Sequence, residues 1–187
     1  RPRIKHEKFQ KGNFTAIPYL KTKPTIDGKS NEWELDKAWM KKDKQIAMGW
    51  RSDGIYFFAS IRDRTDQFEK APKEELFATW WRFDCVESWV DMQNSKSDDT
   101  NKFDCQQFTF WPAIANIRTA PEMYEILWGK RAGKGSFAER KQPVKSSKDI
   151  LVASVEHPDH RGYDMEIFIP HENLLNQDYF KGGQVAG

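Results

Sequence analysis

The chain has 187 residues, with 30 Lys and Arg against 28 Asp and Glu and a formal net charge of +2. This length suits one domain with its own core, and the near balance of charge excludes a global field that would attract nucleic acid. No apolar run is long enough for a transmembrane helix, so we expect no membrane insertion.

The charge is unevenly distributed along the chain. Residues 1–23 carry seven basic side chains and one acidic side chain, a net charge of +6, which leaves −4 for the remainder. We expect residues 1–23 to form a basic N-terminal arm or linker and residues 24–187 to form the folded domain. No signal peptide is visible at Arg1, which fits a mature exported protein and a cytosolic protein equally.

Short runs of alternating, β-branched or aromatic residues recur between polar turn clusters. The predicted strands, in chain order, are 15–20 (a weaker candidate), 45–50, 55–62, 83–91, 103–111, 123–129, 150–156 and 163–169. Helix is expected only as a turn or two over 32–40 and as a short turn over 171–175, after Pro170 ends its strand. This pattern predicts an all-β fold, an antiparallel β-sandwich of immunoglobulin-like or jelly-roll-like type.

The strand predicted over 83–91 carries the main candidate site. Its residues alternate, so the valines Val86 and Val90 share one face while Glu87 shares the other with Cys85, Trp89 and Asp91. If the valines face the core, Glu87 turns outward.

The neighbouring strand adds polar and aromatic residues to the Glu87 side. With Phe108 and Phe110 in the core, the side chains that join Glu87 are Gln107, Thr109 and Trp111, next to Trp81 from the approach to the first strand. Sugar rings offer C–H groups that stack on aromatic faces and hydroxyls that donate and accept hydrogen bonds. The alternative is a tryptophan-rich core in which a neighbouring Arg satisfies Glu87.

The two cysteines, Cys85 and Cys105, leave their pairing open. A single disulfide fits an exported protein, but the simplest hairpin register, centred near Ser97, does not place the two residues opposite each other. Two buried thiols are the alternative.

Two turns offer candidate metal ligands. His157 and His160 with Glu156 have only a weak metal-site spacing. The oxygen-rich turn that contains Asp98 and Asp99, with Asp104, suits Ca²⁺ better.

Catalysis is not expected. Glu87 and Asp91 share a strand face at roughly 13 Å, too far apart for a retaining glycosidase pair and long even for an inverting pair. The chain has no nucleophile-elbow, phosphate-loop or zinc-hydrolase motif.

A series of landmarks over residues 24–187 resembles the family 9 carbohydrate-binding modules, within the broader DOMON-like group of sandwiches. The central signature, Trp-x-x-Asp-x-Val-Glu, stands at Trp81–Glu87. The other landmarks, in order, are Pro24–Trp33 with Ala38-Trp39, Trp50–Phe57 with Ile61–Asp63, Gln107-Phe108 and Tyr163–Pro170.

The resemblance implies reversible, non-catalytic carbohydrate binding, in which Trp81 stacks on the sugar and Glu87 accepts its hydroxyls, with Gln107 reading hydroxyls beside them. It implies a module of a larger exported polysaccharide-active protein, at an extracellular, cell-surface or periplasmic location. The expected partners are an oligo- or polysaccharide and neighbouring domains, and no cofactor is required. The family often binds calcium, which favours the acidic turn at Asp98.

Two departures from the family pattern concern the site. Thr109 stands where the best-known members place a sugar-binding Arg. The family's last strands and second clamp tryptophan would lie beyond Gly187, so an exposed sheet edge is expected. Candidate substitutes for that tryptophan are Trp80, Trp111 and Trp128.

Two other functions remain open on the sequence. Related sandwiches hold haem b for electron transfer, and the methionines that could serve as ligands are Met48, Met92, Met123 and Met165. The third possibility is a structural or interaction sandwich whose sugar site has decayed.

Overall fold

A computed structural model describes residues 17–33, 39–41, 44–62, 84–90, 106–113, 121–127 and 150–174. This part of the chain is mostly β-strand, with one 3₁₀ turn as its only helical element, so the predicted all-β class is confirmed there. The elements are β1 (Trp39–Lys41), β2 (Lys44–Arg51), β3 (Gly54–Arg62), β4 (Val86–Val90), β5 (Gln106–Trp111), β6 (Glu122–Leu127), β7 (Leu151–Glu156), β8 (Gly162–Pro170) and η4 (His171–Asn173).

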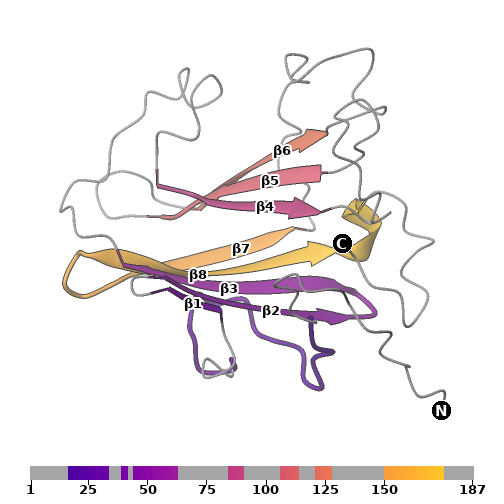
Figure 1. Cartoon of the computed structure of the whole chain (residues 1–187), viewed down its shortest axis with the longest axis horizontal. Coiled ribbons are helices and arrows are strands. Elements are labelled where there is room, and N and C mark those ends of the chain that lie inside the picture. The colour runs from indigo at the N-terminus through magenta and orange to yellow at the C-terminus, as the bar shows by residue number, and fades with distance from the viewer. Residues whose placement is uncertain are drawn as a thin grey trace.

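The strands form two antiparallel sheets, a five-stranded sheet in the order β1-β2-β3-β8-β7 and a three-stranded sheet in the order β4-β5-β6. Figure 1 shows the three-stranded sheet above one face of the five-stranded sheet. One hydrophobic cluster draws residues from both sheets, among them Phe57, Met165 and Ile167 from the larger sheet and Val90, Phe108 and Phe110 from the smaller one.

β2 and β3 form a tight hairpin around the Ser52-Asp53-Gly54 turn that the sequence marks as a break. Arg51 pairs with Gly54, so only two residues connect the strands. Gly54 has a φ of 155°, and a Cβ there would lie 2.2 Å from the Ile169 carbonyl oxygen. Glycine is therefore required where β3 begins alongside β8.

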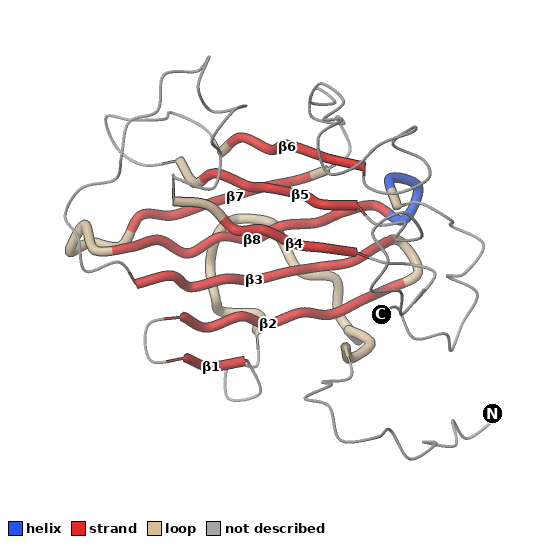
Figure 2. The backbone as a smooth tube through the Cα atoms, turned by 45° about the horizontal axis from the view of Figure 1, so that its top comes forward, coloured by secondary structure: helices blue, strands red, loops and turns tan. Residues whose placement is uncertain are grey.

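β3 is buried on both of its faces. Ile55 and Phe57 point into the hydrophobic cluster, while Tyr56 and Phe58 lie on the opposite face and are just as completely buried. The covering element is the segment 17–33, hereafter the N-terminal strap. It runs along the far side of the five-stranded sheet in Figure 1 and crosses its strands as a tan tube in Figure 2.

The strap also pairs with the outer edge of β2. Leu20 N donates to Trp50 O and Trp50 N donates to Pro18 O, each at 3.0 Å, which makes an isolated parallel bridge between Tyr19 and Trp50. Gly49 leaves room for Leu20, because a Cβ on Gly49 would lie 2.3 Å from Leu20 Cγ. The strand predicted over 15–20 is thus reduced to a bridge within the described residues.

One element differs in type from the sequence prediction. The prediction of a helical turn over 32–40 is wrong at its C-terminal end. Trp39–Lys41 forms the strand β1, which pairs antiparallel with β2. Strand pairing here overrides the local pattern, as tertiary context commonly does. The short turn expected after Pro170 is confirmed as η4.

Candidate functional site

The candidate site lies on the face of β4 and β5 that points away from the hydrophobic cluster. Glu87 pairs directly with Thr109, and Trp89 pairs directly with Gln107, so these four side chains share one face. The intervening Phe108 belongs to the hydrophobic cluster on the other face. The predicted alternation is confirmed, with Phe108 and Phe110 in the core and Glu87, Gln107 and Thr109 on the opposite face.

Glu87 and Gln107 are brought together across the two strands. Gln107 Nε2 donates to Glu87 Oε1 at 3.2 Å. The Gln107 side chain is 2% exposed, whereas Glu87 is exposed. The buried amide therefore fixes one oxygen of a carboxylate that solvent and solutes can still reach.

The other two predicted residues of this face lie below the surface. Thr109 is 0% exposed and Trp111 is 2% exposed. Thr109 Oγ1 makes no hydrogen bond within the part of the chain that the structure describes. Glu87 is exposed, in contrast to these two side chains.

Trp89 is an additional aromatic residue on this face that the sequence interpretation did not include in the site. It lies two residues from Glu87 on β4, and 45% of its surface is exposed. The strand alternation already placed it on the Glu87 side. Strand alternation does not predict solvent exposure, and the exposure of Trp89 makes it a candidate site residue.

Several predicted positions lie outside the described residues. They are Trp81, the acidic triplet Asp98, Asp99 and Asp104, the alternative tryptophans Trp80 and Trp128, Cys105 and Met92. Of the two cysteines, Cys85 is described: burial raises the pKa of its thiol to about 12, and the charges of Glu87 and Asp84 act in the same direction.

The His157–His160 turn, the other candidate metal site, engages two separate carboxylates. His157 Nε2 lies 2.9 Å from Asp164 Oδ1, and His160 Nδ1 lies 2.7 Å from Glu156 Oε1. Within the described ranges, no three His, Cys, Asp or Glu side chains come together as a potential metal site. The same ranges contain no helix with the length and apolarity needed to cross a membrane.

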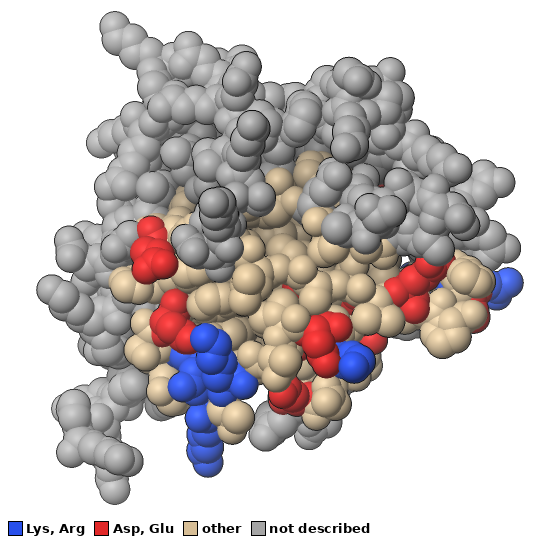
Figure 3. Space-filling model, turned by 180° about the vertical axis from the view of Figure 1, so that it is seen from behind, with Lys and Arg blue, Asp and Glu red and all other residues tan. Residues whose placement is uncertain are grey.

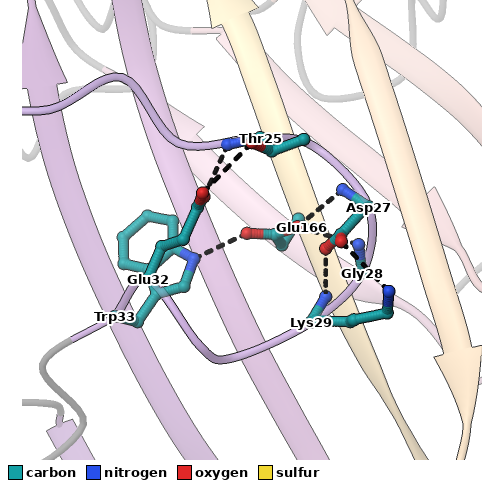
Figure 4. A network of polar contacts seen from close by, with 7 residues as sticks. All are labelled: Thr25, Asp27, Gly28, Lys29, Glu32, Trp33 and Glu166. Carbon is teal, nitrogen blue, oxygen red and sulfur yellow. Dashed lines mark hydrogen bonds and ion pairs between the residues drawn. The ribbon is translucent and has the colours of Figure 1, made fainter.

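A second glutamate, Glu166 on β8, occupies the most complete polar network described. Its carboxylate is 0% exposed and accepts hydrogen bonds from the backbone N–H groups of Asp27 and Gly28, both at 2.8 Å. The Trp33 indole N–H donates to its other oxygen at 2.7 Å. Figure 4 shows these donors converging from the N-terminal strap. Burial raises the pKa of Glu166, and the three donors counteract this shift.

The Glu166 network depends on the conformation of the strap at Gly28. Gly28 has a φ of 81°, and a Cβ there would lie 3.0 Å from Val155 Cγ2. Glycine therefore allows the Asp27-Gly28 turn to direct two N–H groups at the carboxylate without strain, which another side chain would introduce. Glu166 is thus a structural clamp that fastens the strap to the five-stranded sheet.

A second anchor fastens the strap at the β2–β3 turn. Arg51 Nη1 donates to the carbonyls of Leu20 and Lys21, and Lys23 Nζ lies 3.0 Å from Asp53 Oδ2. On the face shown in Figure 3, basic and acidic side chains of the described residues stand next to one another, without a large area of one sign.

Three of the four methionines considered as haem ligands are described, and they lie in or against the hydrophobic cluster. Met165 is fully buried in the hydrophobic cluster, and Met48 and Met123 pack against it. Each of the three fills apolar space between the strands.

Comparison of the chain with family models, with curated proteins and with solved structures finds no match in any of the three.

Proposed function

We propose that this chain is a non-catalytic carbohydrate-binding domain, built as an antiparallel β-sandwich of the family 9 carbohydrate-binding type. The hydrophobic cluster shared by the two sheets supports the sandwich. The order of sequence landmarks over residues 24–187 supports the family. As a module of a larger exported polysaccharide-active protein, the domain would hold that protein on its substrate.

The observation that carries the proposal is the Gln107–Glu87 pair. An exposed carboxylate held by a buried amide is a fixed hydrogen-bond acceptor, which suits a ligand made of hydroxyl donors. In the proposed site, Trp81 stacks on the sugar and Glu87 accepts its hydroxyls. Gln107 orients Glu87, while Thr109 and Trp111 lie on the same face of the neighbouring strand β5 and are buried.

Calorimetric titration with a panel of soluble oligosaccharides tests the proposal. We expect binding that Glu87→Gln weakens about tenfold, because a charged acceptor is replaced by a neutral amide, and that Trp81→Ala abolishes. Glu172→Gln, at an exposed glutamate on η4, is the matched control and should bind like the wild type.

Two outcomes would contradict parts of the proposal. A folded wild-type protein that binds no sugar on the panel would reject carbohydrate binding and favour a structural or interaction sandwich. Full affinity in a folded Trp81→Ala variant would show that Trp81 is not part of the site. The roles proposed for Glu87 and Gln107 would be unaffected.

A further inference from the structure

The site face carries an exposed aromatic ring whose role the proposed site does not yet explain. Four large apolar side chains are exposed among the described residues, namely Tyr19, Trp89, Leu151 and Val155. Three of them belong to the five-stranded sheet or to the strap that covers it. Single exposed apolar side chains are common, so the position of Trp89 matters more than its exposure alone.

Trp89 is adjacent to the carboxylate–amide pair in both directions of the sheet. Along β4 it is the next residue on the same face as Glu87, at roughly 7 Å. Across the sheet it pairs directly with Gln107, whose amide donates to Glu87. The exposed indole and the exposed carboxylate are therefore neighbours on β4, and the buried amide of Gln107 holds the carboxylate from β5.

We propose that Trp89 is a stacking surface of this site, and that its ligand is a neutral sugar whose hydroxyls are accepted by Glu87. The inference rests on the proposed carbohydrate-binding function and adds a contact residue and a ligand class to it. The C–H face of a pyranose covers the exposed indole, and the hydroxyls at the ring edge reach the carboxylate. Gln107 serves this arrangement as a positioning residue, since it sets the direction of Glu87.

The charge of the patch selects the ligand class. Among the described side chains on this face, Glu87 is the charged one. Asp84, three residues earlier, adds negative charge near the start of β4, where the two carboxylates raise the pKa of the Cys85 thiol and Lys44 acts in the opposite direction. A uronate or sulfated sugar would bring a like charge to the same place, which opposes binding.

The experiment compares neutral and acidic ligands in matched variants. The probes are soluble oligosaccharides of glucose, xylose, mannose and galactose, and oligogalacturonides of equal length, titrated by calorimetry. We expect Trp89→Ala to weaken the best neutral ligand about tenfold and Trp89→Phe to retain affinity within about threefold. Tyr19→Ala removes an exposed aromatic ring from the strap and should leave the affinity unchanged. Oligogalacturonides should bind the wild type at least about fivefold more weakly.

A second readout keeps the test valid if Trp89→Ala fails to fold. In ¹⁵N-labelled wild-type protein, the Trp89 indole N–H signal, assigned with Trp89→Phe, should shift when the best neutral oligosaccharide is added. Binding by the wild type with an unshifted Trp89 signal and full affinity in a folded Trp89→Ala variant would overturn the role of Trp89 alone. Equal affinity for oligogalacturonides would overturn the ligand class. A wild type that binds none of the probes would overturn this inference together with the proposed function.

Discussion

Glu166 and Glu87 both point away from the shared hydrophobic cluster, yet their surroundings are opposite. Glu166 is completely buried under the N-terminal strap, where three N–H groups converge on its two oxygens. Glu87 is exposed, and one of its oxygens is held by the amide of Gln107. Both are strand glutamates, but Glu166 lies on the inner strand β8 beneath the strap, whereas Glu87 lies on the edge strand β4 and is exposed. The surroundings, and not the residue type, therefore distinguish the carboxylate that serves the fold from the one that faces solvent.

The largest expected effect separates these two roles directly. Glu166→Ala removes the acceptor of three buried hydrogen bonds and should lower the free energy of unfolding by about 3 kcal/mol. Glu87→Ala, at an exposed position, should change it by less than about 0.5 kcal/mol. Urea denaturation measures the free energy of unfolding of both variants. Equal losses in the two variants would contradict the assignment of a structural role to Glu166 alone.

A substitution at Gly28 tests whether the strap's conformation is needed for the buried network. Gly28→Ala combines a positive φ with a Cβ 3.0 Å from Val155 Cγ2, and should cost about 1–2 kcal/mol of unfolding free energy. Lys29→Ala is the matched control, since its ion pair with Asp27 is exposed and contributes little. An unaffected Gly28→Ala variant would show that the clamp tolerates another turn geometry.

A substitution at Thr109 tests the buried position that pairs with the exposed Glu87 across the sheet. Its buried hydroxyl has no hydrogen-bond partner in the described part of the chain, so Thr109→Val should raise the free energy of unfolding by up to about 1 kcal/mol. Thr109→Ser keeps the hydroxyl and should not stabilise. Calorimetry on Thr109→Val would also show whether this hydroxyl contributes to sugar affinity, and a loss of affinity would place it in direct contact with the ligand.

The smallest effect concerns an exposed histidine–carboxylate pair on the β7–β8 turn. The hydrogen bond and charge of Glu156 raise the pKa of His160 above its ordinary value of 6.5, and Asp159 adds to the shift. A raised folded-state pKa gives stability that is fully present below about pH 6.5 and is lost as the pH rises through the folded-state pKa. The melting temperature of the wild type should therefore fall slightly more between pH 6 and pH 8 than that of His160→Gln. Identical pH profiles would contradict a charged pair.

The local sequence pattern predicted the positions of most of the strands. Seven predicted strands fall on observed ones, because alternation and turn clusters such as Ser52-Asp53-Gly54 are properties of neighbouring residues. The strap over the outer face was missed, although the uninterrupted apolar run Ile55–Ala59 is typical of a strand that is buried on both faces. Glu166 was missed for a related reason: its partners lie 133 to 139 residues away in sequence.

The sequence predicted which side chains of the candidate site share one face of the sheet, but not which of them are exposed to solvent. Alternation placed Glu87, Gln107 and Thr109 on one side of the sheet, as the register confirms. It could not show that Gln107 and Thr109 are buried while Glu87 and Trp89 are exposed, because exposure depends on segments from elsewhere in the chain. Trp81 and the acidic triplet lie outside the described residues and stay predictions.

The short bridge between the strap and β2 has a consequence for the handling of the purified protein. Pro18 and Leu20 occupy the backbone groups of Trp50 at the edge of the five-stranded sheet. Trypsin-like cleavage after Lys21 would release them and leave an unpaired edge that another molecule can extend. We therefore expect an intact strap to protect this part of β2 from pairing with another molecule.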